Sequence, residues 1–277
     1  MRALIAAFAA VAALVAASPA AADYVALGDS YAAGPLIPLQ IAPYGCLKSS
    51  NNYAHLAAPK LRQPAFRDAS CSGAETEDMT APQGVTPGPN PPQFDSLDAD
   101  TQIVTFNIGG NDIGFTSIAE NCLSTTPTGT FCKSDYVHDG RDEISERIAE
   151  TAPKVAAVIQ GIRARAPQAR IFAVNYAAIF PERGAFGCWP QLPVADGDIA
   201  YLREKQRELN AMIAAQAAVN GAGLIDWYRA SIGHDACKPP LIRWVEPLLP
   251  ANAAAPVHPN LLGMVGAAKL VVAAAGG

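Results

Sequence analysis

Residues Val25 to Gly34 read VALGDSYAAG, in which a short apolar run stops abruptly at Gly28, Asp29 and Ser30. Continuous apolar runs bounded by turn residues are typical of buried strands in a parallel sheet. The turn after the run exposes one hydroxyl, that of Ser30, at the carboxyl end of the predicted strand. Ligands of open α/β sheets bind beyond these strand ends, and Ser30 is therefore a candidate functional residue.

Further segments share the character of this strand, because they are short, apolar and rich in β-branched or aromatic side chains. These segments are Ile103 to Gly109, Arg170 to Tyr176, Gly223 to Trp227 and, with a weaker pattern, AFRDAS at 65–70. Together with Tyr24 to Leu27 they predict a parallel sheet covered on both faces.

Apolar residues recur at near-helical spacing between the predicted strands, at about 143–167, 198–221 and 262–275. Asp198 is expected to cap the second of these helices, and Asn220 with Gly221 to end it. Pro153 is expected to kink the first helix or split it in two. Strands that alternate with helices of this length predict an α/β domain with three α/β/α layers.

Two long stretches interrupt the alternation, the Pro/Gly-rich segment 80–97 and the segment 122–139. Long ordered loops in compact domains are often functional, so the wall of a substrate cleft is their natural use. For Cys122 to Cys132 a surface excursion with no role in chemistry is an equal alternative.

The N-terminus has the pattern of a secretory signal peptide over residues 1–22. A basic start, Met1-Arg2, precedes an apolar run that is too short for a comfortable membrane span, and small residues follow it. Cleavage after Ala22 would leave one mature domain over 23–277. We therefore expect a secreted, extracellular protein.

The chain carries a formal net charge of −5, and this mildly acidic balance makes nucleic acid an unsuitable partner. No amphipathic anchor is evident, so we expect no stable membrane anchor. A monomer is expected.

The six cysteines are an even set without the CxxC spacing of a metal site, which in an exported chain predicts disulfides. The sequence leaves their connectivity open, but sequential pairing closes the smallest loops. That pairing joins Cys46 to Cys71, Cys122 to Cys132 and Cys188 to Cys237.

Three residues besides Ser30 stand near predicted strand ends or the C-terminus: Gly73 in SCSGAET, Asn111 in IGGNDIG and His258 in VHPN. Each by itself is equally explained as a turn residue, a helix cap or a surface histidine. Together with Ser30 they supply a nucleophile, a base and oxyanion donors, which are the parts needed for acyl transfer.

These four blocks, GDSYAAG, the glycine block, GGND and HPN, occur in an order that resembles the SGNH hydrolases, the GDSL lipases and esterases. The resemblance covers essentially the whole mature chain. The six-cysteine layout and the SCSGAET segment are most similar to those of secreted actinomycete lipases and esterases. It implies a flavodoxin-like sheet of about five strands and hydrolysis of carboxylic esters of small molecules or lipids.

The resemblance also implies roles for individual residues. Ser30 would be the nucleophile and His258 the general base. The backbone N–H groups of Ser30 and Gly73 and the side-chain amide of Asn111 would form the oxyanion hole. Asp29, next to the nucleophile, is better explained as a structural residue that accepts backbone hydrogen bonds in the turn.

One position departs from the family pattern, because the acidic residue common three positions before the histidine is here Ala255. Similar actinomycete enzymes imply that a backbone carbonyl orients the imidazole, and we expect the Ala255 carbonyl to accept the Nδ1–H of His258. The alternative is a carboxylate from elsewhere, with Asp226 as the obvious candidate.

No cofactor or metal site is predicted. The other histidines, His55, His138 and His234, show no ligand spacing, and neither Walker A, GxGxxG nor GxSxG patterns occur. Two further functions use the same scaffold: a carbohydrate esterase that removes acetyl groups, and a secreted binding protein without catalysis. Loops at 82–94 and at 180–193, with Phe186 and Trp189, are expected to select the substrate.

Overall fold

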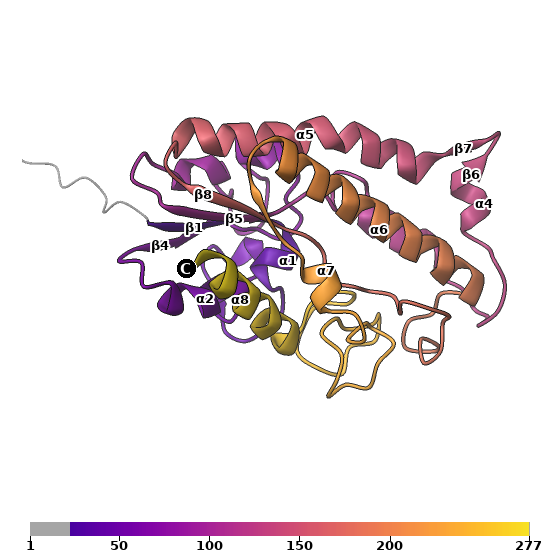
Figure 1. Ribbon diagram of the computed structural model, residues 1–277. Helices are drawn as coiled ribbons and strands as arrows, with labels where there is room; N and C mark the ends of the chain where they lie inside the picture. Colours follow the sequence, from indigo (N-terminus) through magenta and orange to yellow (C-terminus); the bar gives the residue numbers. More distant parts are fainter. Residues whose placement is uncertain (1–22, 277) are drawn as a thin grey trace, which may run out of the picture.

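The computed structural model describes residues 23–276, and within this range its centre is one sheet of five strands (Figure 1). In spatial order the strands are β4 (Phe66–Asp68), β1 (Tyr24–Gly28), β5 (Ile103–Asn107), β8 (Arg170–Val174) and β9 (Gly223–Ile225). Every neighbouring pair is parallel. Numbered within this sheet alone, the order is 2-1-3-4-5, which is the flavodoxin-like order. The predicted fold class is confirmed.

Helices cover both faces of the sheet and complete the three layers (Figure 1). The two longest, α5 (Glu143–Arg165) and α6 (Asp196–Val219), pack against each other on one face. On the other face α2 (Tyr53–Leu61) packs against α8 (Leu261–Ala275).

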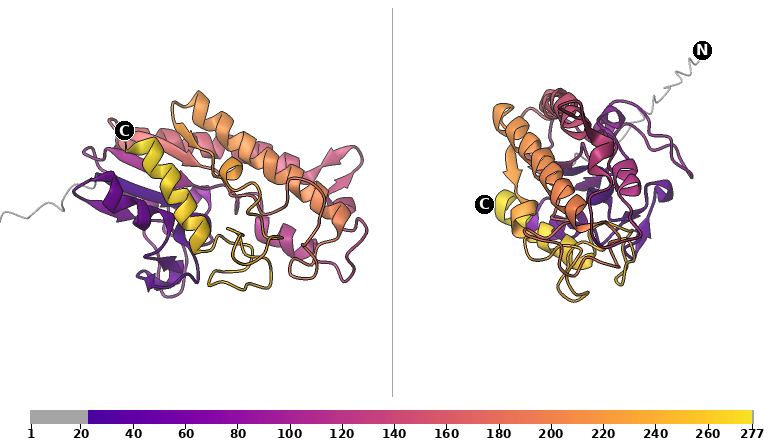
Figure 2. Two further views of the ribbon diagram at one scale, coloured as in Figure 1. Left: turned by 60° about the horizontal axis from the view of Figure 1, so that its bottom comes forward. Right: turned by 90° about the vertical axis from the view of Figure 1, so that its right-hand side faces the viewer.

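Shorter elements occupy the connections of the described chain. The helices are α1 (Ser30–Ala33), α3 (Phe115–Asn121), α4 (Lys133–Tyr136) and α7 (Trp227–Ala230), with 3-10 turns at Tyr44–Cys46, Thr76–Met79 and Gln93–Ser96. The small strands are β2 (Gln40–Ile41), β3 (Lys48–Ser49), β6 (Val137–His138) and β7 (Arg141–Asp142). The irregular connection between α7 and α8, orange to yellow in Figure 2, is the longest stretch without regular structure near the C-terminus.

The predicted strands and long helices are all present, with two corrections in the helices. Pro153 does not split α5, which is continuous from Glu143 to Arg165 and has the proline ring on its exposed side. Asp198 does not cap α6, which begins at Asp196.

Asp198 has a different task, which explains why the capping prediction fails. Its side chain is buried inside the first turns of α6 and accepts backbone N–H groups of Phe131, Cys132 and Lys133, at 2.7, 3.2 and 3.1 Å. Asp198 therefore fixes the disulfide loop and the start of α4 rather than its own helix.

The three disulfides of the described chain follow the predicted sequential pairing: Cys46 with Cys71, Cys122 with Cys132, and Cys188 with Cys237. The first of them joins the segment before β3 to the segment that leads from β4 to Gly73.

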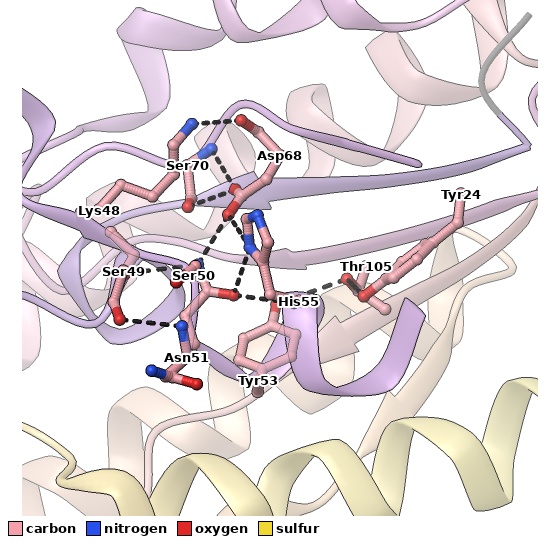
Figure 3. Close-up of polar contacts among 12 residues, drawn as sticks. Tyr24, Lys48, Ser49, Ser50, Asn51, Tyr53, His55, Asp68, Ser70 and Thr105 are labelled. Carbon is pink, nitrogen blue, oxygen red and sulfur yellow. Dashed lines mark hydrogen bonds and ion pairs between the residues drawn. The ribbon is translucent and has the colours of Figure 1, made fainter. Parts of the chain in front are cut away.

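A buried polar cluster holds this same segment at the end of β4 (Figure 3). The carboxylate of Asp68 accepts hydrogen bonds from Asn52 Nδ2 at 2.7 Å and Ser70 Oγ at 2.6 Å, and lies 3.2 Å from His55 Nδ1. Burial raises the pKa of Asp68, but the contacts with His55, Lys48 and Ser70 outweigh it and lower that pKa. The cluster accounts for His55 as a structural residue.

The turn after β1 requires a glycine, because Gly28 has a φ of 139° and a Cβ there would lie 2.4 Å from the Asn107 carbonyl oxygen. The buried side chain of Gln93 completes the turn. It accepts the Gly28 N–H at 2.7 Å and donates to the Gly28 carbonyl at 2.9 Å. Gln93 belongs to the Pro/Gly-rich segment 80–97, so this segment braces the exit of β1.

The predicted signal peptide, residues 1–22, lies outside the described residues. Within residues 23–276 no helix has both the length and the apolar character that a bilayer crossing requires.

Candidate active site

The first strand delivers Ser30 to the carboxyl edge of the sheet, where it begins the short helix α1. Asp29 caps this helix, because its carboxylate accepts the Tyr31 N–H at 2.9 Å. The same carboxylate accepts a hydrogen bond from the Tyr176 hydroxyl at 2.5 Å. Asp29 is buried and fully engaged in the turn, in agreement with the structural role expected of it.

His258 reaches Ser30 from the connection between α7 and α8, although 228 positions separate the two residues. The Nε2 atom of His258 lies 2.7 Å from Ser30 Oγ, and its Nδ1 atom lies 2.7 Å from the Pro256 carbonyl oxygen. A carbonyl only accepts, so Nδ1 carries the proton in the neutral ring. Nε2 is then free to accept the proton of the Ser30 hydroxyl.

The acceptor for Nδ1 is therefore Pro256 and not Ala255, which corrects the sequence-based choice by one residue. A tight turn is the reason: the Ala255 carbonyl accepts the backbone N–H of His258 at 3.2 Å, and Val257 has a φ of 60°. The next carbonyl, that of Pro256, consequently faces the ring.

The alternative carboxylate, Asp226, lies elsewhere. It caps α7 by accepting the Arg229 N–H at 3.0 Å, and it accepts the side-chain amide of Asn175 at 2.9 Å. Its contacts do not include His258, so it is not the group that orients the imidazole.

A buried ion pair secures the segment that carries His258. Glu246 pairs with Arg243 at 2.7 Å and accepts the side-chain amide of Asn260, the residue that caps α8. The Glu246 backbone N–H also donates to the His258 carbonyl at 2.9 Å. Burial by itself raises the pKa of Glu246, but the hydrogen bonds from Arg243, Asn252 and Asn260 lower it to about 2.

Gly73 and Asn111 line the same cavity as Ser30 and His258, so the structure brings all four predicted residues together. The Asn111 amide donates one hydrogen bond, to the Ala74 carbonyl at 2.8 Å, and an amide nitrogen carries a second N–H. Among the described residues, no acceptor is recorded for the backbone N–H of Ser30 or Gly73. Within the described chain these three N–H groups therefore have no protein acceptor, and all three belong to residues that line one cavity.

The cavity has a volume of about 410 Å³, and most of the side chains around it are apolar. They come from α3, α5, α6 and the segment after β8, and include Ile118, Ile144, Ile179, Leu192, Leu202 and Leu209. Such a mainly apolar cleft with a few polar groups at one end is typical of a small-molecule site.

The loops expected to form the cleft contribute less than the sequence suggested. Segment 82–94 supplies none of the residues around the cavity, since it packs against the turn after β1. From 180–193, Phe180 and Leu192 line the cavity, but Trp189 does not and Phe186 is 96% exposed. Leu123 is the contribution of segment 122–139.

Burial shifts the pKa values of two residues at the site, Asp29 and His258. Burial raises the pKa of Asp29 to about 7, against the lowering effect of hydrogen bonds from Tyr176 and Tyr31. Burial lowers the pKa of His258, and the hydrogen bond to the Pro256 carbonyl offsets only part of this change. A lowered imidazole pKa keeps His258 neutral, and able to accept a proton, at neutral pH.

The remaining histidines lie outside this cavity. His138 is exposed in β6, and His234 stacks on Trp244 with ring centroids 4.5 Å apart. In the part of the chain that the structure describes, no three His, Cys, Asp or Glu side chains form a group suited to a metal ion.

Sequence reasoning missed two residues at the site, Pro256 and Tyr176. Pro256 lies two positions before His258, so the motif pointed to the right turn but not to the right carbonyl. Tyr176 ends a predicted strand segment, and its position at the sheet edge was the one available signal.

A five-stranded flavodoxin-like sheet with a serine–histidine pair at its carboxyl edge defines a serine hydrolase architecture. Comparison with known proteins identifies the family within this class. A model of the GDSL-like Lipase/Acylhydrolase family matches residues 26–265. Lipase 2 of Streptomyces coelicolor is 40% identical over 252 residues, which cover 87% of this chain and 81% of that protein.

Solved structures agree with this comparison. The extracellular lipase of Streptomyces rimosus has a TM-score of 0.74 at 25% identity, covering 92% of this chain and 100% of that one. Phospholipase A1 of Streptomyces albidoflavus has a TM-score of 0.76 at 24% identity, covering 92% and 99%, and shows a shared fold. The chain belongs to the GDSL-like lipase/acylhydrolase family and is a carboxylic ester hydrolase.

Proposed function

We propose that the protein is a secreted lipase or esterase that works through a covalent acyl-enzyme at Ser30. The observation that carries this proposal is the 2.7 Å contact between Ser30 Oγ and His258 Nε2 at an apolar cavity. Secretion is supported by the signal-peptide pattern of residues 1–22 and by the three disulfides.

Acylation begins when Ser30 Oγ attacks the ester carbonyl carbon and His258 Nε2 takes the hydroxyl proton. The negative oxygen of the tetrahedral intermediate then accepts hydrogen bonds from the N–H groups of Ser30 and Gly73 and from the amide of Asn111. When the intermediate collapses, the bond to the alcohol oxygen breaks and His258 returns the proton to it. Water repeats the sequence to release the acid and restore Ser30.

The Pro256 carbonyl orients His258 in this mechanism without contributing a full negative charge. It accepts the Nδ1–H, fixes the tautomer and stabilises the imidazolium that forms during attack. The Pro256 carbonyl thus takes the place of the carboxylate that accepts the Nδ1–H in a Ser-His-Asp triad.

The apolar cavity is proposed to bind the acyl chain of the substrate. Burying a methylene contributes about 0.8 kcal/mol, which corresponds to about a fourfold gain in kcat/KM for each carbon that enters the cavity. We therefore expect kcat/KM for p-nitrophenyl esters to rise steeply from acetate to medium-length chains, measured below the critical micelle concentration.

Acetylated sugars serve as the comparison in the same assay. A preference for them over medium-chain esters would contradict the proposed use of the cavity and favour a carbohydrate acetyl esterase. No ester hydrolysis by folded protein would instead favour a binding protein.

The pH dependence of activity follows from the environment of His258. The base acts only when neutral, and burial lowers its pKa below the ordinary value of about 6.5. The protonation of His258 should therefore reduce kcat/KM along an acid limb whose midpoint lies below about 6.5. An Asp29→Asn variant, which removes the second titrating group of the site, should keep this limb. A midpoint above that value in a pH–rate profile would contradict the assignment.

A further inference from the structure

The Tyr176 hydroxyl makes two hydrogen bonds that the ester mechanism does not use. It donates to Asp29 Oδ2 at 2.5 Å and accepts the backbone N–H of Gly110 at 2.7 Å. The tyrosine lies two residues after the end of β8 at Val174, and its backbone N–H and carbonyl are both bonded to Asn210. The Tyr176 N–H donates to Asn210 Oδ1 at 2.9 Å, and Asn210 Nδ2 donates to the Tyr176 carbonyl at 3.0 Å.

Both partners of this hydroxyl adjoin residues of the proposed oxyanion hole. Asp29 precedes Ser30, and through its bond to the Tyr31 N–H it sets the start of α1. Gly110 precedes Asn111 in the loop after β5. One buried hydroxyl therefore connects the turn of the nucleophile to the loop of the amide donor.

The loop after β5 approaches Tyr176 closely at Gly110, where only a glycine leaves room for the hydroxyl. A Cβ at Gly110 would lie 2.9 Å from the Tyr176 hydroxyl oxygen, so a larger residue would displace the hydroxyl. The loop on the other side of Asn111 has its own links to the glycine block: the amide bonds to Ala74, and the Asp112 carboxylate accepts the Thr76 N–H at 3.0 Å. The Tyr176 hydroxyl supplies a corresponding link toward Ser30.

We propose that Tyr176 is a positioning residue that sets Asn111 relative to Ser30, so that the oxyanion donors converge before the substrate arrives. This inference rests on the proposed ester hydrolysis. Preorganised donors stabilise the transition state because they need no rearrangement during the reaction, and a displacement of about 1 Å can lower the rate about 100-fold. Tyr176 acts through Asn111 and does not itself exchange protons with the substrate.

The test removes the hydroxyl with Tyr176→Phe and measures kcat and KM separately on a medium-chain ester. We expect kcat to fall about 10- to 100-fold with KM changed less than about twofold, because the loss affects the transition state more than substrate binding. The matched control is Tyr24→Phe. It also removes a buried hydroxyl, one bonded to Thr105 Oγ1 at 3.0 Å (Figure 3). Tyr24 is the first residue of β1, whereas Ser30 follows the other end of that strand. Its kcat should match the wild type.

A double-mutant cycle with Asn111→Ala separates positioning from a general structural effect. If Tyr176 acts through Asn111, removing its hydroxyl in the Asn111→Ala background should lower kcat by less than about threefold. An equal loss in both backgrounds, or wild-type kcat in Tyr176→Phe, overturns the inference. If Tyr176→Phe does not fold, Gly110→Ala replaces it in the cycle, because its Cβ displaces the hydroxyl, and the same outcomes apply.

The two proposals fail in different ways. If the ester hydrolysis proposal is wrong, folded wild-type protein will hydrolyse no ester. If only the positioning role is wrong, the effects of Tyr176→Phe and Asn111→Ala on kcat will be additive, while the wild type and Asn111→Ala alone behave as the mechanism requires.

Discussion

Replacing Ser30 with alanine is expected to lower kcat for ester hydrolysis by about 10⁶-fold. The hydroxyl is the only group of the proposed mechanism that forms a covalent bond to the substrate, so its loss removes the acylation route altogether. Within the described residues the Ser30 side chain makes one hydrogen bond, to His258 Nε2, and the cap of α1 is supplied by Asp29. The folded state should therefore be preserved, which circular dichroism and thermal unfolding can verify.

Ser72→Ala is the matched control for this variant. Ser72 lines the same cavity, and its buried hydroxyl oxygen has no hydrogen-bond partner among the described residues. Its kcat should stay close to wild type. A folded Ser30→Ala variant with more than about one hundredth of wild-type kcat would remove Ser30 from the mechanism.

The second largest effect is expected from Asn111→Ala, which should lower kcat about 10²- to 10³-fold. The amide of Asn111 supplies one of the three N–H donors of the proposed oxyanion hole, and its contribution is largest when the substrate oxygen carries a full negative charge. KM should change little for the same reason. The variant also loses the bond to the Ala74 carbonyl, so the Gly73 loop gains freedom.

Asn121→Ala controls for the loss of an amide near the cavity without a role in the oxyanion hole. Its side chain bonds to the Tyr136 hydroxyl at 3.1 Å at the end of α3. Steady-state kinetics should show wild-type kcat for this control. Equal kcat in Asn111→Ala and wild type would exclude Asn111 from the oxyanion hole.

The fold was predictable because its signals are local. Strands β1, β5 and β8 are largely apolar runs, and every strand of the central sheet overlaps a predicted segment, although β1 includes Gly28 beyond the predicted end at Leu27. The residues at the strand ends were predictable for the same reason, since parallel strands place their carboxyl ends at one edge. The four-block order then linked Ser30, Gly73, Asn111 and His258 into one site.

The features that sequence reasoning missed depend on contacts between distant segments. The choice between the carbonyls of Ala255 and Pro256 depends on the positive φ of Val257, which no side-chain pattern reveals. Asp198 fits the pattern of a helix cap, but a loop more than sixty positions away occupies its carboxylate. Tyr176 carries no motif, and its role follows only from what its hydroxyl contacts.

The central claim, that Ser30 is the nucleophile activated by His258, is tested most directly by covalent labelling. Folded wild-type protein is treated with a fluorophosphonate ester, and intact mass spectrometry followed by peptide mapping locates the adduct. The mechanism predicts one adduct per chain, on Ser30, none in Ser30→Ala, and wild-type labelling in Ser72→Ala. An active protein that carries its adduct on another residue, or none, would contradict the account.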